Sequence, residues 1–157
     1  MGARINILNY QIKSNEPQAD LKIEYSDLKS IEIRKEEVPL LIDELPLVAV
    51  VATQAQGKTV VSGAKELRIK ETDRIKAIVN ELKKMGADIE EKEDGFIVTG
   101  PSRLKGAVCE SYNDHRIAMS LVVAALLAEG KTMIRNSECI DISFPCFEKT
   151  LQKLIYF

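Results

Sequence analysis

The stretch LRIKETDRIKAIVNELKKMGADI, residues 67–89, joins a polar cluster of both charge signs to a segment of helical periodicity. Apolar residues recur along it at helical spacings: Ile75, Ile78, Val79, Leu82 and Met85. One apolar stripe of this kind predicts an amphipathic helix, which Gly86 ends. We therefore expect a helix that packs by one face against a core and carries Lys70, Glu71 and Arg74 on its first turn.

The charges on this first turn indicate an anionic ligand. The N-terminus of a helix carries partial positive charge and unpaired N–H groups, so it suits Glu71. The same field disfavours Lys70 and Arg74 unless an anion shares the site. The local pattern leaves a simpler alternative open, a solvated helix start with an internal ion pair between Glu71 and Arg74.

The composition is that of one ordinary globular domain. The chain has 157 residues, of which 45% are hydrophobic and 29% are charged. A formal net charge of -2 gives no basic field for nucleic acid or membranes, so an anion site has to be built locally. The three cysteines form no CxxC pair and leave an odd thiol, and no apolar helix approaches the ~20 residues that span a bilayer. We expect a cytoplasmic protein without nucleic-acid or membrane partners.

An internal repeat divides the chain into two copies. The tripeptide Gly-Lys-Thr at 57–59 recurs at 130–132, a spacing of 73 residues, and Met-Gly-Ala at 1–3 recurs at 85–87. In the second case the glycine follows a helix, so the first copy predicts a further helix upstream of Met1. Copies of this length predict a duplicated α/β unit whose neighbours share one core.

Each copy predicts the same order of elements, a strand pair, a buried helix, a strand, a loop and an amphipathic helix. In the first copy we expect strands at 4–9, 21–25, 31–33 and 58–62, a loop at 14–19 and a buried helix at 46–56. In the second we expect a hairpin over 89–99, a loop at 101–106, strands at 107–110 and 131–134, a buried helix at 117–129, a loop at 139–145 and helical periodicity over 144–155. The approximate units are 4–86 and 88–157.

Polar side chains gather at the entry of each predicted helix. Besides the first cluster they are Asp43, Glu44, Asp114, His115, Arg116 and Ser143. If the helices run roughly parallel, these entries share one face, and the set suits a small polyanion with acid–base chemistry beside it.

Each of these residues also has a simpler explanation. Asp43 and Asp114 are placed to cap helices, and a single histidine such as His115 is more often a structural group. Arg116 on an otherwise apolar helix needs a partner, either Asp114 or a bound anion. Because no second histidine or cysteine stands at ligand spacing, we expect no metal site.

Four stretches resemble motifs of the EPSP synthase (3-phosphoshikimate 1-carboxyvinyltransferase) family. They are residues 67–75, Asp43-Glu44-Leu45-Pro46, Tyr-Asn-Asp-His-Arg-Ile-Ala-Met at 112–119 and Ser143-Phe144-Pro145. The resemblance covers nearly the whole chain but corresponds only to the C-terminal portion of that enzyme. It implies the α/β (α+β) inverse fold of enolpyruvyl transferases, with two domains of three βαβαββ-type units each and the active site between them. This chain would hold two units of one domain.

The resemblance also implies an activity, transfer of the enolpyruvyl group of phosphoenolpyruvate to the 5-hydroxyl of shikimate-3-phosphate with release of phosphate. This reaction belongs to the shikimate pathway to chorismate and aromatic amino acids. By the matching motifs, Asp43 would contact the hydroxyls of shikimate-3-phosphate and act as base toward the attacking one. Lys70 would bridge both substrates, and Glu71 would handle the proton at the phosphoenolpyruvate methylene.

The same motifs imply a binding site for phosphoenolpyruvate. Arg74 and Arg116 would hold its carboxylate and phosphate, with His115 nearby. An arginine suits this task because its planar guanidinium meets such oxyanions with two parallel hydrogen bonds. Positioning of reactants and neutralisation of charge need no metal or cofactor.

The chain departs from the family pattern at two positions. Some relatives carry a lysine that touches phosphoenolpyruvate where this chain has Ile142, and an amide where it has Glu66. The residues that bind the shikimate phosphate from the other domain lie outside the chain, so we expect it to need the missing N-terminal part as a partner and to be inactive alone. Two alternatives are a fragment of the sister enzyme that uses UDP-N-acetylglucosamine, and a non-catalytic anion-binding or assembly module.

Overall fold

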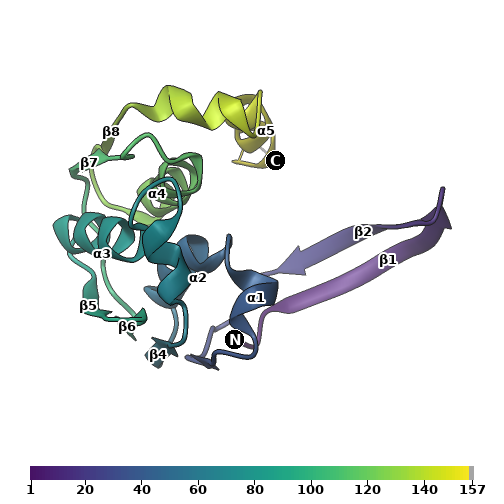
Figure 1. Cartoon of the computed structure of the whole chain (residues 1–157). Helices are drawn as coiled ribbons and strands as arrows, with labels where there is room; N and C mark the ends of the chain where they lie inside the picture. Colours follow the sequence, from purple (N-terminus) through teal and green to yellow (C-terminus); the bar gives the residue numbers. More distant parts are fainter. Residues whose placement is uncertain (156–157) are drawn as a thin grey trace.

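Two series of strands and helices follow one another in the computed structural model, which describes residues 1–155 (Figure 1). The first series consists of β1 (Arg4–Lys13), β2 (Glu16–Glu24), β3 (Glu32–Ile33), α1 (Val38–Leu41), α2 (Leu45–Ala52), β4 (Gly57–Val61), the 3-10 helix η1 (Lys65–Ile69) and α3 (Arg74–Lys84). The second consists of β5 (Asp88–Lys92), β6 (Gly95–Gly100), β7 (Val108–Glu110), α4 (His115–Leu127), β8 (Met133–Arg135), the 3-10 helix η2 (Ser137–Ile142) and α5 (Phe147–Ile155). Apart from α1, the order of elements is the same in both. The predicted mixed α/β class is confirmed.

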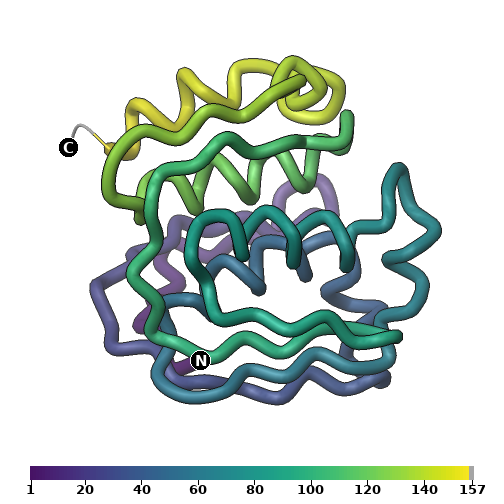
Figure 2. The backbone as a smooth tube through the Cα atoms, turned by 90° about the vertical axis from the view of Figure 1, so that its left-hand side faces the viewer, coloured from purple at the N-terminus to yellow at the C-terminus, as the bar shows by residue number. Residues whose placement is uncertain are grey.

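The main sheet has four strands in the order β3-β4-β6-β5. Strands β3 and β4 are parallel, whereas β6 runs antiparallel to both β4 and β5. Figure 2 shows these strands as one layer, with the helices stacked beyond it. The predicted apolar stripe of α3 is at most 1% exposed at each position, so it lies in the core between sheet and helices. A smaller parallel sheet pairs β7 with β8.

Helix α3 begins four residues later than the charge cluster suggests. The side chain of Asp73 accepts a hydrogen bond from the backbone N–H of Lys76 at 3.0 Å and caps the helix, so Arg74 is its first residue. Lys70 follows the last residue of η1 and has an extended backbone conformation. The prediction that Lys70 and Glu71 lie on the first turn is therefore wrong, because the carboxylate of Asp73 satisfies the free N–H groups at a later position.

Strands β1 and β2 form a long hairpin that projects from the body of the protein (Figure 1). The predicted loop at 14–19 is wrong. Only Ser14 and Asn15 form the turn, both with positive φ, as a tight two-residue hairpin turn requires. Pro17 lies within β2 opposite Ile12, which an isolated two-stranded ribbon tolerates because its outer edges need no partner.

The remaining boundaries differ from the predicted ones by a few residues. Helix α2 is shorter than predicted and ends at Ala52, whereas α4 begins two residues early at His115. The last predicted strand starts only at Met133, and the predicted loop at 139–145 begins inside η2. None of the helices within residues 1–155 is long and apolar enough to cross a membrane.

Candidate anion-binding site

The guanidinium of Arg74 is the centre of the site. Its Nε donates to Asp114 Oδ2 at 2.8 Å, its Nη1 to Asp43 Oδ1 at 2.9 Å and its Nη2 to Glu71 Oε2 at 2.6 Å. The arginine side chain is only 2% exposed. The first residue of α3 thus joins the segment before α2, the segment before α3 and the start of α4.

Asp114 is the innermost of these carboxylates, with a fully buried side chain. Its Oδ1 accepts from the backbone N–H groups of Arg116 at 2.8 Å and Ile117 at 3.2 Å, so it caps α4. Its Oδ2 is left for Arg74. The simpler explanation of Asp114 as a cap is confirmed, but the same carboxylate also anchors the arginine. A buried carboxylate of this kind depends on both sets of partners.

Asp43 does not cap α2. The capping position belongs to Glu44, whose side chain makes no capping hydrogen bond. The two carboxylates instead face Arg116. Glu44 Oε1 accepts from its Nη1, and Asp43 Oδ2 lies 3.8 Å from its Nη2. Asp43 therefore lies between both arginines, and the partner that the sequence requires for Arg116 is this acidic pair.

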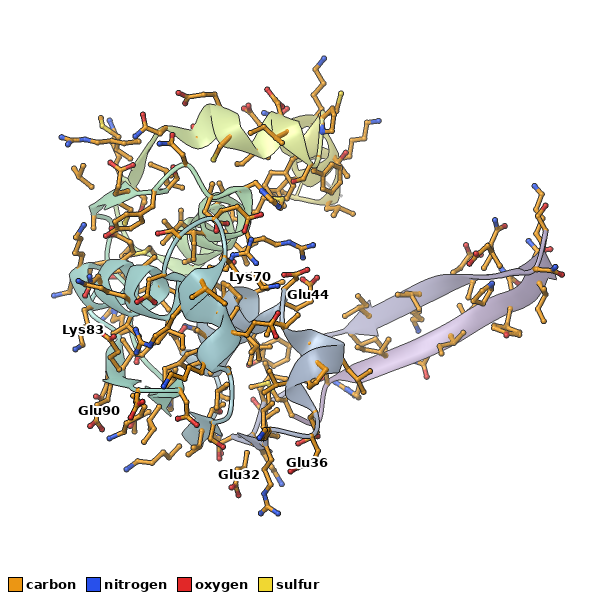
Figure 3. All side chains as sticks on the ribbon, viewed as in Figure 1. Glu32, Glu36, Glu44, Lys70, Lys83 and Glu90 are labelled. Carbon is orange, nitrogen blue, oxygen red and sulfur yellow. The ribbon has the colours of Figure 1, made fainter. Side chains whose placement is uncertain are left out.

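Lys70 and His115 lie beside this cluster and take no part in it. The Nζ of Lys70 lies 3.5 Å from Glu66 Oε1, and its side chain is 27% exposed. Figure 3 shows Lys70 and Glu44 at one end of the helix layer, away from Lys83. His115 is the half-buried first residue of α4. Of the predicted site residues, the ion pairs bring together Asp43, Glu71, Arg74 and Arg116.

The electrostatics keep Arg74 charged. Burial lowers the pKa of its guanidinium, but the hydrogen bond and charge of Asp114, together with those of Glu71 and Asp43, outweigh this effect and raise the pKa above its ordinary value. The outer carboxylates are accessible, since the side chains of Asp43 and Glu71 are 45% and 50% exposed. Asp114 therefore fixes the arginine from the buried side, and the carboxylates of Asp43 and Glu71 lie between the arginine and solvent.

A pocket of about 320 Å³ opens next to Arg116. Its lining comes from the entry of α2, the first turns of α4 and the start of α5: Asp43, Glu44, Leu47, Arg116, Met119, Ser120, Val123, Ser143, Phe144 and Phe147. The charged residues lie together, and apolar side chains make up much of the remaining wall. Within residues 1–155 no three histidine, cysteine or acidic side chains gather as a metal site would need.

One buried acid was missed by the sequence analysis. Glu81 on α3 is fully buried, although it carries a charge. The available signal was its position, since it stands three residues after Ile78 and four before Met85 and so falls on the apolar stripe. An acidic residue on a core face needs hydrogen-bonding partners, which the sequence does not identify.

The fold and the site together define a mixed α/β protein with a cluster of paired arginines and carboxylates at helix N-termini. The sequence profile described as EPSP synthase (3-phosphoshikimate 1-carboxyvinyltransferase) matches residues 1–151. The chain belongs to the EPSP synthase family.

Individual relatives agree with this assignment. The 3-phosphoshikimate 1-carboxyvinyltransferase of Petrotoga mobilis is 55% identical over 155 residues, and that of Thermoanaerobacter sp. strain X514 is 54% identical over 154. Each alignment covers 98% of this chain and 36% of the relative. A solved EPSP synthase from Acinetobacter baumannii superimposes with a TM-score of 0.92 at 40% identity, again over 98% of this chain and 36% of the other. The chain thus spans about a third of the length of these relatives.

Proposed function

We propose that this chain is the C-terminal portion of a 3-phosphoshikimate 1-carboxyvinyltransferase and supplies part of its active site. The reaction transfers the enolpyruvyl group of phosphoenolpyruvate to the 5-hydroxyl of shikimate-3-phosphate and releases phosphate. The observation that carries the proposal is the environment of Arg74, a buried guanidinium with one buried and two accessible carboxylate partners. This arrangement can exchange a protein carboxylate for an anionic substrate group.

The exchange follows from the exposure of the three partners. Asp114 is buried and holds Nε, so the plane of the guanidinium stays fixed. Asp43 and Glu71 are about half exposed and can swing into solvent when the carboxylate or phosphate of phosphoenolpyruvate approaches. The two terminal nitrogens of Arg74 then meet the ligand side by side, and Arg116, 30% exposed, does the same from α4. His115, the residue before it, completes this binding set.

The displaced carboxylates become the acid–base groups of the reaction. Asp43 removes the proton of the 5-hydroxyl as the oxygen of that hydroxyl attacks C2 of phosphoenolpyruvate. Glu71, which takes up a proton from solvent once it has left Arg74, gives that proton to the methylene carbon. In the elimination step Glu71 takes a proton back from that carbon, the bond from C2 to the phosphate oxygen breaks, and the departing phosphate takes the proton that Asp43 holds. Lys70 bridges the two substrates and neutralises the charge that develops. Such groups contribute roughly 10²- to 10⁴-fold each, and no cofactor is required.

The rest of the enzyme is needed to complete the site. Three cations in and beside the site, those of Lys70, Arg74 and Arg116, form ion pairs with five carboxylates. Two phosphorylated substrates add further negative charge, so additional cations must come from the part of the protein outside this chain. The chain alone is therefore inactive, and its partner is the missing N-terminal part.

The exposed apolar face of the projecting hairpin β1–β2 supports contact with this N-terminal partner. Residues opposite one another in an antiparallel pair point to the same face, and Ile5 faces Ile23, Ile7 faces Leu21, and Ile12 faces Pro17. The isoleucine and leucine members of this apolar face are 53–69% exposed. The corresponding hairpin of the second series, β5–β6, is covered, because β6 pairs with β4 and Val98 is fully buried. A strand and helices of the missing part cover β1–β2 in the same way.

The other end of the chain is open in the corresponding place. Among the residues that the structure describes, β8 pairs only with β7, whereas its counterpart β4 also receives β6. Helix α5 is amphipathic, yet none of its nine residues is fully buried. One further unit in contact with both ends completes the domain.

The proposed compartment is the cytoplasm, because its reducing conditions fit the free thiols of Cys109, Cys139 and Cys146.

The test uses a chimera in which this chain replaces the matching 155-residue segment of the Petrotoga mobilis relative. We expect phosphate release that requires both phosphoenolpyruvate and shikimate-3-phosphate, and none from the chain alone. Asp43→Asn and Glu71→Gln reduce turnover by about 100-fold or more. Glu148→Gln, an exposed glutamate of α5, is the matched control and leaves turnover unchanged.

Titration calorimetry on the same chimera separates binding from turnover. Glu71→Gln removes a competitor for Arg74, so it binds phosphoenolpyruvate at least as tightly as the parent while turning over slowly, whereas Arg116→Ala binds it weakly. A folded chimera that releases no phosphate contradicts the proposed reaction. Turnover only with UDP-N-acetylglucosamine as acceptor identifies the sister activity. Binding of phosphoenolpyruvate that is unchanged by Arg116→Ala would mean that the rest of the chimera supplies the site and that this chain is a non-catalytic scaffold.

A further inference from the structure

A second buried carboxylate, that of Glu81, lies on α3 about two helical turns after Arg74. Its side chain is fully buried and accepts four hydrogen bonds. Lys84 Nζ donates to both oxygens at 2.8 and 2.7 Å, the backbone N–H of Glu110 to Oε2 at 3.1 Å, and the hydroxyl of Tyr112 to Oε1 at 2.7 Å. Two of these donors belong to the segment that leads from β7 into α4.

That segment contains an unfavourable turn. Tyr112 and Asn113 both adopt the left-handed conformation, with φ of 56° and 55°, and neither is glycine. This conformation is common for asparagine but unfavourable for tyrosine, so Tyr112 needs contacts that hold it there. Besides Glu81, the turn is held by the backbone hydrogen bond that closes it, from Asp114 N to Ser111 O at 3.0 Å, and by bonds from Asn113 N to Ser111 Oγ at 3.1 Å and from Tyr112 N to Glu110 Oε1 at 3.3 Å.

The turn leads directly into the anion-binding site. Asp114 follows it, and His115 and Arg116 come next on the first turn of α4. Helix α3 therefore contacts this segment twice, through Arg74 to Asp114 at its start and through Glu81 to Tyr112 near its end. The first contact lies in the site, whereas the second is remote from it. Together they fix the direction in which α4 presents Arg116.

We propose that Glu81 is a positioning residue that acts through the hydroxyl of Tyr112. It holds the left-handed turn at 112–113 and so places Asp114 and Arg116 for the ligand. Burial together with the hydrogen bond to Glu81 raises the pKa of Tyr112 to about 12, so the phenol keeps the proton that it donates. The role of Glu81 in holding the turn does not depend on the proposed function. Only the effect of the turn on substrate affinity rests on that function.

The test compares two single-atom changes in the chimera. Tyr112→Phe removes the hydroxyl that reaches Glu81. Tyr25→Phe is the matched control, because the hydroxyl of Tyr25 also donates to a carboxylate, that of Asp27 at 3.3 Å, on an exposed segment of the first series. We expect Tyr112→Phe to raise the KM for phosphoenolpyruvate by about tenfold, as for loss of one hydrogen bond to a charged group, with kcat changed less than about twofold. Tyr25→Phe leaves both unchanged.

Hydrogen exchange gives a second readout that is independent of activity. The amides of Arg116 and Ile117 bond to Asp114 and report on the turn, whereas those of Ile78 and Val79 report on the core. We expect the first pair to exchange about tenfold faster in Tyr112→Phe, with the second pair unchanged. Equal rates at Arg116 and Ile117 in both tyrosine variants overturn the proposal, as does a uniform rise that includes the core. An inactive parent chimera contradicts the proposed function alone, since the exchange rates still decide the role of Glu81.

Discussion

Replacement of Arg74 by methionine should destabilise the chain far more than loss of an ordinary ion pair. Methionine keeps much of the length of the side chain and removes the charge. Asp114, fully buried, then loses its cation, and removal of one partner of a buried pair costs about 3–5 kcal/mol. The pairs with Asp43 and Glu71 are half exposed on the carboxylate side and contribute about 0–1 kcal/mol each. We expect a loss of about 4 kcal/mol, a large fraction of the 5–15 kcal/mol of a typical domain.

A second substitution separates the buried charge from simple loss of packing. Asn at position 114 still caps α4 but carries no charge, so Asp114→Asn in the Arg74→Met background should restore about 2 kcal/mol. Urea unfolding followed by circular dichroism gives the free energies and the m-values. Arg103→Met is the control, because Arg103 forms an exposed ion pair with Glu129 and should change stability by less than about 0.5 kcal/mol.

Two results would refute this reasoning. The first is a loss below about 1 kcal/mol for Arg74→Met at an unchanged m-value, which would mean that the carboxylate of Asp114 is stable without the arginine. The second is strict additivity of the Arg74→Met and Asp114→Asn effects, which would mean that the two groups are not coupled.

Three further outcomes are expected. Burial, helped by the charge of Glu81, raises the pKa of Cys109 from 9.0 to about 11, so the unfolded thiol ionises first and this thiol contributes a fall in stability of about 2 kcal/mol between pH 9 and 11. Urea unfolding at both pH values should show a smaller fall in Cys109→Ala. Gly95→Ala should destabilise by about 3 kcal/mol or more in thermal unfolding, because the new Cβ would lie 1.9 Å from the carbonyl oxygen of Val61. Ile7→Lys should leave the melting temperature of the chain unchanged, since that side chain is 65% exposed, yet weaken the assembly of the chain with the proposed N-terminal part in a binding assay.

The sequence predicted elements best where one periodic pattern governs a whole segment. The apolar stripe of α3 was placed correctly, and the nearly all-apolar helices α2 and α4 were placed to within a few residues, because burial of such faces leaves few alternatives. The start of α3 was misplaced because two acidic residues, Glu71 and Asp73, both suit a helix N-terminus, and only the side chain of Asp73 reaches a free N–H group. Local chemistry alone does not rank two caps two residues apart.

The site was predictable as a set of residues but not as a set of contacts. Polar groups at helix entries marked most of the cluster, whereas the choice of partners depends on tertiary packing. Asp43 and Asp114 are 31 and 40 residues from Arg74, and nothing in the sequence assigns the buried contact to Asp114 rather than Asp43. Glu81 shows the same limit, since its hydrogen-bonding partner Tyr112 is 31 residues away in the second series of elements.

The positions of the two arginines are unfavourable for the helices that carry them. Arg74 is the first residue of α3 and Arg116 the second of α4, where a positive charge opposes the partial positive charge of the helix end. In the chain as it stands, Asp43, Glu44 and Glu71 offset this charge. In the proposed reaction an anionic substrate group replaces Asp43 and Glu71, so part of its binding free energy is spent on breaking their ion pairs. Affinity is reduced by that amount, but the same step frees the two carboxylates to accept protons beside the bound substrate. Binding of the substrate and activation of the two carboxylates as bases then occur in the same step. Part of the binding free energy thereby lowers the barrier of the chemical step and does not appear as ground-state affinity.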